Sequence, residues 1–250
     1  MNTMRLIDTH AHIDELPDIE QSLERAKTKD LVAIIAVGSS FLANMKVLAL
    51  AEQYRNYVYP AIGIHPHEAE ANLEEAFKAI ESNAIHCVAI GEIGLDYQYA
   101  VNKARQKEVL EVMLDIAKKY DKPVSLHSRR AWDDVLSLVQ AHGIKKGVFH
   151  WYSGPIETLQ RILDYGYFIS ATPAVDYSRK HKEAILNTPI ERILLETDTP
   201  VKYRGVASEP SDTARVLEIV AEMKDVTASQ LADITTRNAS NLFNLSTQDT

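Results

Sequence analysis

Eight times along its 250 residues, this chain follows a short apolar segment with a longer amphipathic one. The short segments are apolar at successive positions, as in Val-Ala-Ile-Ile-Ala-Val at residues 32–37. A strand of this kind has no polar face, so it must be buried on both sides, as the strands of a parallel sheet are. The pattern predicts strands at Arg5–Thr9, Leu31–Val37, Val58–Ile64, Cys87–Gly91, Pro123–Leu126, Gly147–Phe149, Tyr167–Ser170 and Ile193–Leu195.

The longer segments have the spacing of helices with one apolar face. In residues 103–120, Glu111, Asp115 and Lys119 share one face, while the other face is apolar. The same periodicity predicts helices at Asp133–His142, Ile156–Tyr165 and Ser211–Lys224.

Eight strand–helix units without a linker or a break in composition favour an α/β fold, a single-domain (β/α)8 TIM barrel spanning residues 1–250. An open, doubly wound sheet would usually carry a glycine-rich phosphate loop after its first strand, and the sequence has none there. We expect a last helix at about Ala228–Leu242 to pack outside the ring, and the end, Ser246–Thr250, to fray.

The composition narrows the class of protein further. A formal net charge of −8 argues against a protein that coats nucleic acid with a broad basic face, although bound cations can dominate a compact site. Cys87 is the only cysteine, so no intrachain disulfide can form. No apolar stretch approaches the ~20 residues of a membrane span, and no basic segment followed by an apolar one opens the chain. We therefore expect a cytoplasmic protein without a membrane partner.

His10 and His12 end the first predicted strand two positions apart. Alternate side chains of a strand point to the same face, so both rings would present nitrogen ligands to one small volume. In a TIM barrel the active site lies at the carboxyl ends of the strands. Four further side chains that can bind metal end predicted strands at this rim: Glu92, His127, His150 and Asp198.

Six ligands are too many for one tetrahedral ion that keeps an open position, so we expect two divalent ions with Glu92 as the bridge. The two ligand sets are then His10, His12, Glu92 and Asp198, and Glu92, His127 and His150. Zn²⁺ or Mn²⁺ suits the imidazoles, and the carboxylates also permit Mg²⁺. Such a centre activates water, and Glu92 and Asp198 are the candidate catalytic residues, with Asp198 placed to orient that water or accept its proton.

The remaining histidines are not expected to be ligands. His86 begins the fourth strand at the opposite end of the barrel, and His142 closes a helix. His181 lies among basic residues on what we expect to be a solvated face. His65 is at the correct rim, where either a substrate contact or a supporting role is open, and His67 is expected to lie in a loop.

The sequence also resembles a known family at several separate motifs. They are His10-Ala-His12 followed by Asp14, GIHPHEA at 63–69, GEIGLDY at 91–97, HSR at 127–129, HWYSG at 150–154, ETDTP at 196–200 and RNASNLF at 237–243. In this order they resemble the TatD family of metal-dependent deoxyribonucleases. The resemblance implies a TIM barrel, a two-ion site on the residues above and nuclease activity on DNA. Where relatives in the wider amidohydrolase group often use a carboxylated lysine as the bridge, this chain has Glu92.

Two departures from the family pattern lie where substrate would sit. Trp151-Tyr152 stands where the family more often has a Phe before the Ser-Gly, and Val-Lys-Tyr-Arg-Gly follows Pro200. Candidate substrate contacts are His65, Arg129 as a phosphate fork, and the aromatic rings of Tyr97, Trp151, Tyr152 and Tyr203 as stacking surfaces. Candidate supporting residues for the ligands are Asp8, Asp14 and Glu196.

The function that we expect is hydrolysis of DNA phosphodiester bonds, exonuclease-like, with DNA or a nucleotide as substrate. An alternative is a hydrolase of amide or ester bonds, such as a deacylase acting on an aminoacyl nucleic acid, because the same centre can polarise a carbonyl. A third is a partner-binding protein on an inherited barrel, against which the intact ligand set speaks. The sequence leaves the oligomeric state open.

Overall fold

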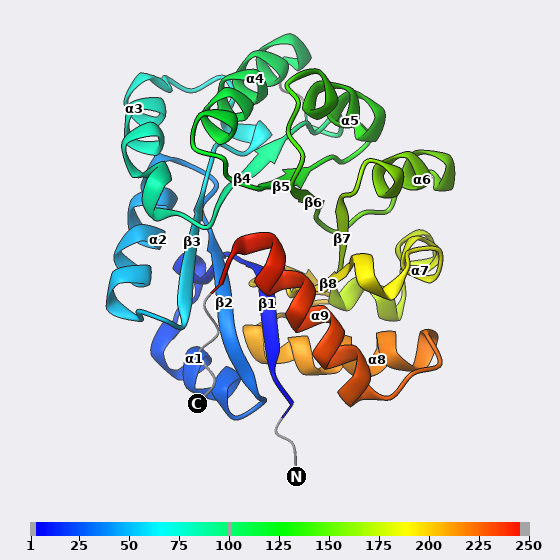
Figure 1. Ribbon diagram of the computed structural model, residues 1–250. Coiled ribbons are helices and arrows are strands. Elements are labelled where there is room, and N and C mark those ends of the chain that lie inside the picture. The colour runs from blue at the N-terminus through cyan, green and yellow to red at the C-terminus, as the bar shows by residue number, and fades with distance from the viewer. Residues whose placement is uncertain (1–3, 100–101, 246–250) are drawn as a thin grey trace.

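The computed structural model describes residues 4–99 and 102–245. Its main sheet contains eight parallel strands in the order β1 to β8, each hydrogen-bonded to the next along the chain. The strands are β1 (Leu6–Ala11), β2 (Leu31–Val37), β3 (Val58–Ile62), β4 (Ala89–Gly94), β5 (Val124–His127), β6 (Gly147–Phe149), β7 (Phe168–Ala171) and β8 (Ile193–Leu195). The sheet curls into a ring with the helices outside it, which confirms the predicted single-domain TIM barrel (Figure 1).

Helices alternate with the strands. They are α1 (Ile19–Lys27), α2 (Phe41–Gln53), α3 (Glu74–Asn83), α4 (Lys103–Lys119), α5 (Trp132–Ala141), α6 (Ile156–Asp164), α7 (Arg179–Leu186), α8 (Thr213–Met223) and α9 (Ala228–Phe243). A two-stranded hairpin, β9 (Lys202–Tyr203) with β10 (Val206–Ala207), follows β8. Among the described residues, no helix has both the length and the apolarity that crossing a membrane requires.

The ring is closed between β1 and the segment that follows β8. The Asp198 amide donates to the His10 carbonyl at 2.9 Å, and the His12 amide donates to the Thr199 carbonyl at 2.9 Å. The buried carboxylate of Asp8 joins the same two segments, because it accepts from the His10 amide at 3.2 Å and from the Thr197 amide and hydroxyl at 3.1 and 2.6 Å. The first and last strands are thereby fixed to each other at the carboxyl-terminal mouth.

Gly94 lets β4 and β5 approach closely at this mouth. It has φ +151, and a Cβ at this position would lie 1.9 Å from the His127 carbonyl oxygen. Only glycine fits both the dihedral angle and the space. β4 runs three residues further than the sequence pattern predicts, so Glu92 lies inside the strand and faces His127 of β5.

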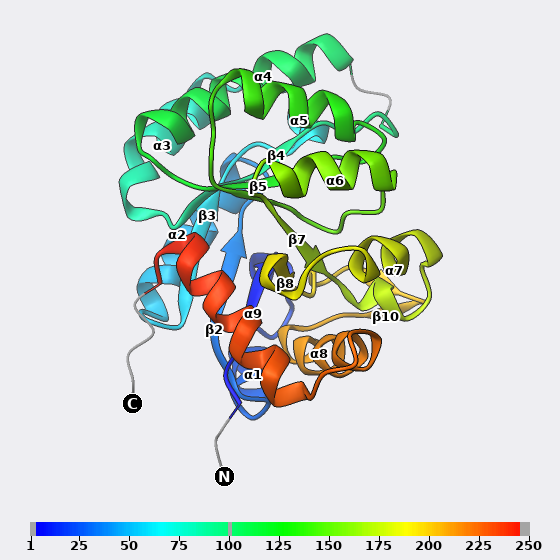
Figure 2. The ribbon, with the colours of Figure 1, turned by 45° about the vertical axis from the view of Figure 1, so that its right-hand side comes forward.

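The last helix closes the other mouth. Asn238 of α9 donates to the Ile193 carbonyl at 2.9 Å, at the start of β8, and Thr236 donates to the Arg5 carbonyl just before β1. Leu242 and Phe243 belong to a buried cluster with the side chains that point into the barrel. The expectation that α9 packs outside the ring is therefore wrong: it crosses the amino-terminal mouth, next to β1 and β8 (Figures 1 and 2).

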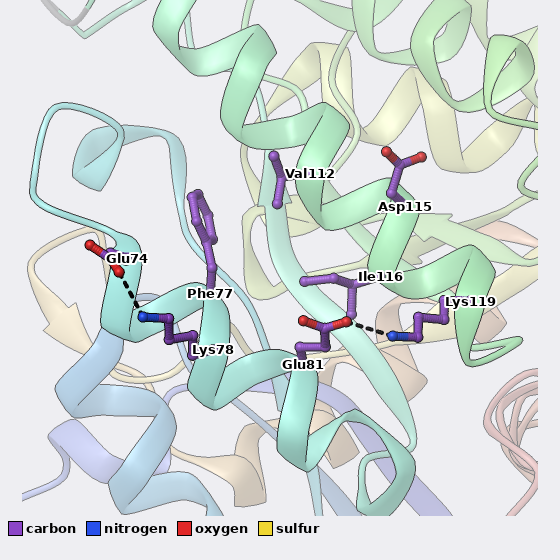
Figure 3. A pocket seen from close by; sticks show the side chains of 8 residues that line it. All are labelled: Glu74, Phe77, Lys78, Glu81, Val112, Asp115, Ile116 and Lys119. Carbon is purple, nitrogen blue, oxygen red and sulfur yellow. Dashed lines mark hydrogen bonds and ion pairs between the residues drawn. The ribbon is translucent and has the colours of Figure 1, made fainter.

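Between α3 and α4 the outer surface has a shallow hollow with Phe77 and Ile116 on its walls (Figure 3). Its lysines are paired with glutamates, because Lys78 contacts Glu74 at 2.6 Å and Lys119 contacts Glu81 at 2.6 Å. These exposed pairs each contribute little to stability, because water screens the two charges.

His181 of α7 is wrongly placed by the sequence analysis. It is 0% exposed rather than solvated, although its neighbours in sequence are basic and exposed. Its Nε2 accepts from the Thr172 amide at 3.1 Å and its Nδ1 donates to the Tyr152 carbonyl at 2.8 Å. The helix period explains the difference, since His181 shares the inward face of α7 with the buried Ala184 and Ile185, while the outward face is largely polar.

Burial lowers the pKa of His181 to about 4, against the hydrogen bond to Tyr152, which raises it. The unfolded chain binds a proton near pH 6.5, so His181 stabilises the fold fully above that pH. This stabilisation is lost as pH falls toward 4, by roughly 3 kcal/mol.

We expect the unfolding free energy of His181→Gln, measured by urea titration, to depend less on pH between about 6.5 and 4 than that of the wild type. His86→Gln, at an exposed position, should retain the wild-type dependence; equal pH profiles for wild type and His181→Gln would contradict the assignment.

Candidate metal centre

A cavity of about 640 Å³ opens at the carboxyl-terminal mouth of the barrel. Most of the predicted ligands line it, and His10 lies just beneath them, fully buried. The fold thus brings together predicted ligands that are distributed along the sequence from β1 to the segment after β8. Those lining the cavity are His12, His65, Glu92, His127, His150 and Asp198.

Four atoms from three segments surround one point in this cavity. The Nε2 atoms of His10 and His12 lie 3.4 Å apart. His10 Nε2 is 3.7 Å from Glu92 Oε2 and 3.7 Å from Asp198 Oδ1, and for His12 Nε2 these distances are 3.4 and 3.5 Å. Imidazole nitrogens and carboxylate oxygens this close together are a donor set that would suit a divalent cation such as Zn²⁺.

The other oxygen of Glu92 faces a second group of imidazoles. Glu92 Oε1 lies 2.7 Å from His127 Nδ1, 3.0 Å from His150 Nε2 and 3.5 Å from His65 Nε2. The two oxygens of one carboxylate therefore address two separate donor groups, which is the arrangement of a bridging ligand. The nitrogen and oxygen donors fit divalent ions such as Zn²⁺ or Mn²⁺.

The first group coincides with the first predicted ligand set. The second contains the predicted His127 and His150, and it adds His65, whose role the sequence left open. His65 lies beyond the end of β3 and is followed by Pro66, so no strand pattern points to this ring. His67 lies in a 3-10 turn (Pro66–Glu68) at the edge of the cavity and contacts His65.

The rings of His10 and His12 have contacts at their outer nitrogens, and the outer nitrogen of His150 faces a carboxylate without a hydrogen bond to it. His12 Nδ1 donates to the Val37 carbonyl at 2.8 Å, and His10 Nδ1 lies 3.1 Å from the hydroxyl of Ser125. His150 Nδ1 faces Glu196 at 3.4 Å. Such contacts fix the ring plane and direct the opposite nitrogen inward.

Asp96 anchors His127 and was not assigned a role from the sequence. Its Oδ2 lies 2.7 Å from His127 Nε2 and accepts from Arg129 Nε at 2.8 Å. The carboxylate is fully buried, which is unusual for an aspartate without a positional role. The signal was its place in the GEIGLDY motif, four residues after Glu92, but Asp96 lies beyond β4, where strand alternation no longer predicts direction.

The predicted supporting residues lie in different places. Glu196 accepts from the Trp151 amide at 3.0 Å and faces His150, so it supports that ring. Asp8 acts on the backbone of β1 rather than on an imidazole. Asp14 has a buried Oδ1 without a hydrogen-bond partner among the described residues, and burial raises its pKa against the charge of His12.

The cluster combines opposite pKa shifts. Burial opposes ionisation of Glu92, but the charges of His65 and His150 hold its pKa well below the ordinary value. Burial opposes protonation of His12, but hydrogen bonds to Asp198 and Glu92 raise its pKa well above the ordinary value. The pKa of His150 is raised likewise, against burial, by the charge of Glu92. Protons on these rings occupy positions that a metal cation would take, so cation binding releases them.

The candidate substrate contacts divide into two groups. Arg129 and Trp151 line the cavity, whereas Tyr97 does not: its hydroxyl donates to Asp134 and its ring lies under Lys103. The expectation of a stacking surface at Tyr97 therefore has no support in the geometry, and Tyr99, two residues on, lines the cavity instead.

Two other aromatic rings named from the sequence are structural. Tyr152 is buried, and its hydroxyl donates to the Pro155 carbonyl at 2.7 Å. Tyr203 donates to the Thr197 carbonyl at 3.0 Å and packs behind Trp151, with ring centroids 5.4 Å apart. Trp151 is therefore supported from behind while its side chain borders the cavity.

If Asp96 orients His127 as a ligand, Asp96→Asn should weaken metal binding about 10–100-fold, because the uncharged amide polarises the ring less. Competition with a chromophoric chelator measures this affinity. The matched control is Asp115→Asn, which removes the charge from a surface aspartate 3.0 Å from His142 Nδ1. Equal metal affinities for Asp96→Asn and wild type would exclude the role.

Comparison with known proteins shows the family to which the chain belongs. A family model described as TatD related DNase matches residues 7–244. The uncharacterized metal-dependent hydrolase YabD of Bacillus subtilis is 34% identical over 254 residues, which cover 96% of this chain and 99% of YabD. The human deoxyribonuclease TATDN3 is 30% identical over 258 residues, covering 95% of this chain and 94% of TATDN3.

The crystal structure of YjjV, a TatD homologue from Escherichia coli, has a TM-score of 0.89 to this fold at 35% identity. The match covers 97% of this chain and 99% of YjjV. The whole barrel, and not only the motifs at its mouth, is therefore shared. The chain belongs to the TatD family of metal-dependent hydrolases.

Proposed function

We propose that this protein hydrolyses phosphodiester bonds of DNA with two divalent metal ions. The proposal rests on the way in which the two carboxylate oxygens of Glu92 face different histidines. Oε2 faces His10 and His12, while Oε1 faces His127 and His150. The printed name of the human relative TATDN3, a deoxyribonuclease, supports DNA as the substrate class.

The residues at the mouth would hold the two ions in two sets that share Glu92. The first set would be His10, His12, Glu92 and Asp198, and the second Glu92, His127 and His150, with His65 beside it. Divalent ions at such a centre supply Lewis acidity, which acidifies water and polarises phosphoryl oxygens. The buried surroundings strengthen these interactions, because little bulk water competes for the charges.

Asp198 is suited to hold a water molecule for attack. Burial raises the cost of its charge, but a hydrogen bond to His12 and the charge of His150 keep its pKa below the ordinary value. It is therefore a carboxylate at neutral pH and can accept a hydrogen bond from water. Because Asp198 lines the cavity, a water molecule beside a bound substrate can reach its carboxylate.

Arg129 favours an anionic substrate. Its Nε donates to Asp96 at 2.8 Å and its guanidinium lies 4.8 Å from the centroid of the Tyr99 ring, so the plane of the fork is fixed at the cavity wall. A fixed guanidinium can bind two oxygens of a phosphate at once. A neutral amide or ester offers no negative charge to the terminal amino groups of this fork, which is why we place phosphodiesters first.

The proposal is tested with a fluorescent single-stranded DNA oligonucleotide. We expect hydrolysis that EDTA abolishes and added Zn²⁺, Mn²⁺ or Mg²⁺ restores, and a fall in rate of at least about 100-fold in Glu92→Gln, because the bridging charge is lost. Glu111→Gln, which changes an exposed glutamate of α4, is the matched control and should be unaffected. Cleavage of aminoacyl esters or amides in place of DNA, or equal activity in wild type and Glu92→Gln, would refute the proposal.

Arg129 has its own kinetic test. Replacing the fork by a point charge in Arg129→Lys should raise KM for the oligonucleotide about tenfold with a smaller change in kcat, as expected for a group that binds phosphate before and during the reaction. Arg161→Lys alters a surface arginine that pairs with Asp133 at 2.7 Å and serves as the control. An unchanged KM in Arg129→Lys would show that the fork contacts no phosphate.

A further inference from the structure

A second hollow adjoins the metal cavity on the side of α7. It has a volume of about 480 Å³ and is lined by Asp176, Tyr177, Arg179, Lys182, Glu183 and Leu186. Tyr177 also lines the metal cavity, so the two hollows meet at its ring. A chain-like ligand that enters the metal site can therefore continue across Tyr177 onto α7.

Two basic and two acidic residues line this second hollow, in a chain whose formal net charge is −8: Arg179 and Lys182 against Asp176 and Glu183. Arg179 and Lys182 are exposed, and neither forms an ion pair with an acidic group among the described residues. The charge of Asp176 is already neutralised, because Arg215 contacts it at 3.0 Å and Arg204 at 3.7 Å. With Arg204 and Arg215 counted, four basic side chains face two acidic ones, Asp176 and Glu183, so the hollow keeps an excess of positive charge.

The hollow between α3 and α4 provides a comparison, because its basic residues are paired with acidic ones. There each lysine on the wall, Lys78 and Lys119, is paired with a glutamate at 2.6 Å (Figure 3). Arg179 and Lys182 also lie in the first turn of α7, where the helix dipole disfavours cations. Their position therefore lowers helix stability and is better explained by an anionic ligand.

An aromatic surface lies between the two charged regions. The ring of Tyr177 is 42% exposed, and the guanidinium carbon of Arg204 lies 5.0 Å from its centroid. Single-stranded nucleic acids are bound by this combination, in which bases stack on exposed rings and the backbone follows cations.

We infer that the Tyr177–α7 surface, defined as Tyr177, Arg179, Lys182 and Arg204, binds the single-stranded DNA that continues from the nucleotide held at the metal centre. This inference rests on the proposed function and specifies its substrate as an oligonucleotide rather than a free dinucleotide. A base next to the cleaved bond stacks on Tyr177, and the following phosphates contact Arg179 and Lys182.

Fluorescence anisotropy of the metal-loaded, full-length protein tests the surface with a fluorescein-labelled, phosphorothioate-linked oligothymidylate of eight nucleotides and a matching dinucleotide. In Arg179→Glu/Lys182→Glu we expect at least a tenfold weaker affinity for the octamer. The slope of log affinity against log salt should become shallower by about 0.7 for each lost phosphate contact. Affinity for the dinucleotide should fall much less, so the advantage of the longer ligand is lost.

The control is Lys29→Glu/Lys118→Glu, which makes the same change in net charge at two exposed lysines far from the mouth. Equal weakening by both double variants would show a general charge effect and overturn the inference. Tyr177→Ala should weaken octamer binding roughly tenfold while Tyr177→Phe preserves it. Wild-type affinity in Tyr177→Ala would also overturn it.

The outcomes separate this inference from the proposed function. Hydrolysis of the unmodified octamer and dinucleotide with equal kcat/KM, unaffected by the α7 variants, would refute the surface and leave the phosphodiesterase intact. Tight octamer binding that depends on Tyr177 and α7, without hydrolysis of either DNA, would refute the phosphodiesterase and support the surface.

Discussion

The charge of Glu92 is the constraint on which the rest of the centre depends. Its carboxylate is 3% exposed and lies within 3.7 Å of nitrogens from five imidazole rings. A carboxylate removed from water is costly unless opposite charge compensates it, and several protonated rings in contact repel each other. Protons alone satisfy this cluster poorly. A divalent cation suits this cluster better, since one ion can bind a carboxylate and two or three neutral imidazole nitrogens at once.

Surrounding elements hold the rings in this costly arrangement. The outer nitrogens of the ligand rings reach Val37 of β2, Ser125 of β5, Asp96 after β4 and Glu196 after β8. Each contact comes from a strand or strand end other than the one that carries the ring, so the barrel itself sets the directions of the ligands. The close approach of β4 and β5 at Gly94 also positions the ligands, because it brings Glu92 into contact with His127.

Strand alternation and barrel topology were enough to predict the fold and to bring six side chains to one mouth. They failed where a side chain is directed by something other than its strand. His65 is followed by a proline, and Asp96 lies past the end of β4, so neither ring nor carboxylate has a periodic signal. The inward position of His181 was hidden by the basic residues beside it. The choice between Tyr97 and Tyr99 depends on the course of the loop after β4, which composition does not specify. The place of α9 depends on the size of the opening it covers, a property of the assembled ring.

The buried carboxylate of Asp8 also affects when the site can exist. Asp8 accepts hydrogen bonds from the backbone of both His10 and Thr197, which lie almost two hundred positions apart in the sequence. The next residue, Asp198, contacts the rings of His10 and His12. A growing polypeptide that has left the ribosome only through α7 carries five of the imidazole rings but lacks the partner that Asp8 grips and the last carboxylate. Cation binding by the complete donor set therefore has to wait until the segment after β8 has been synthesised.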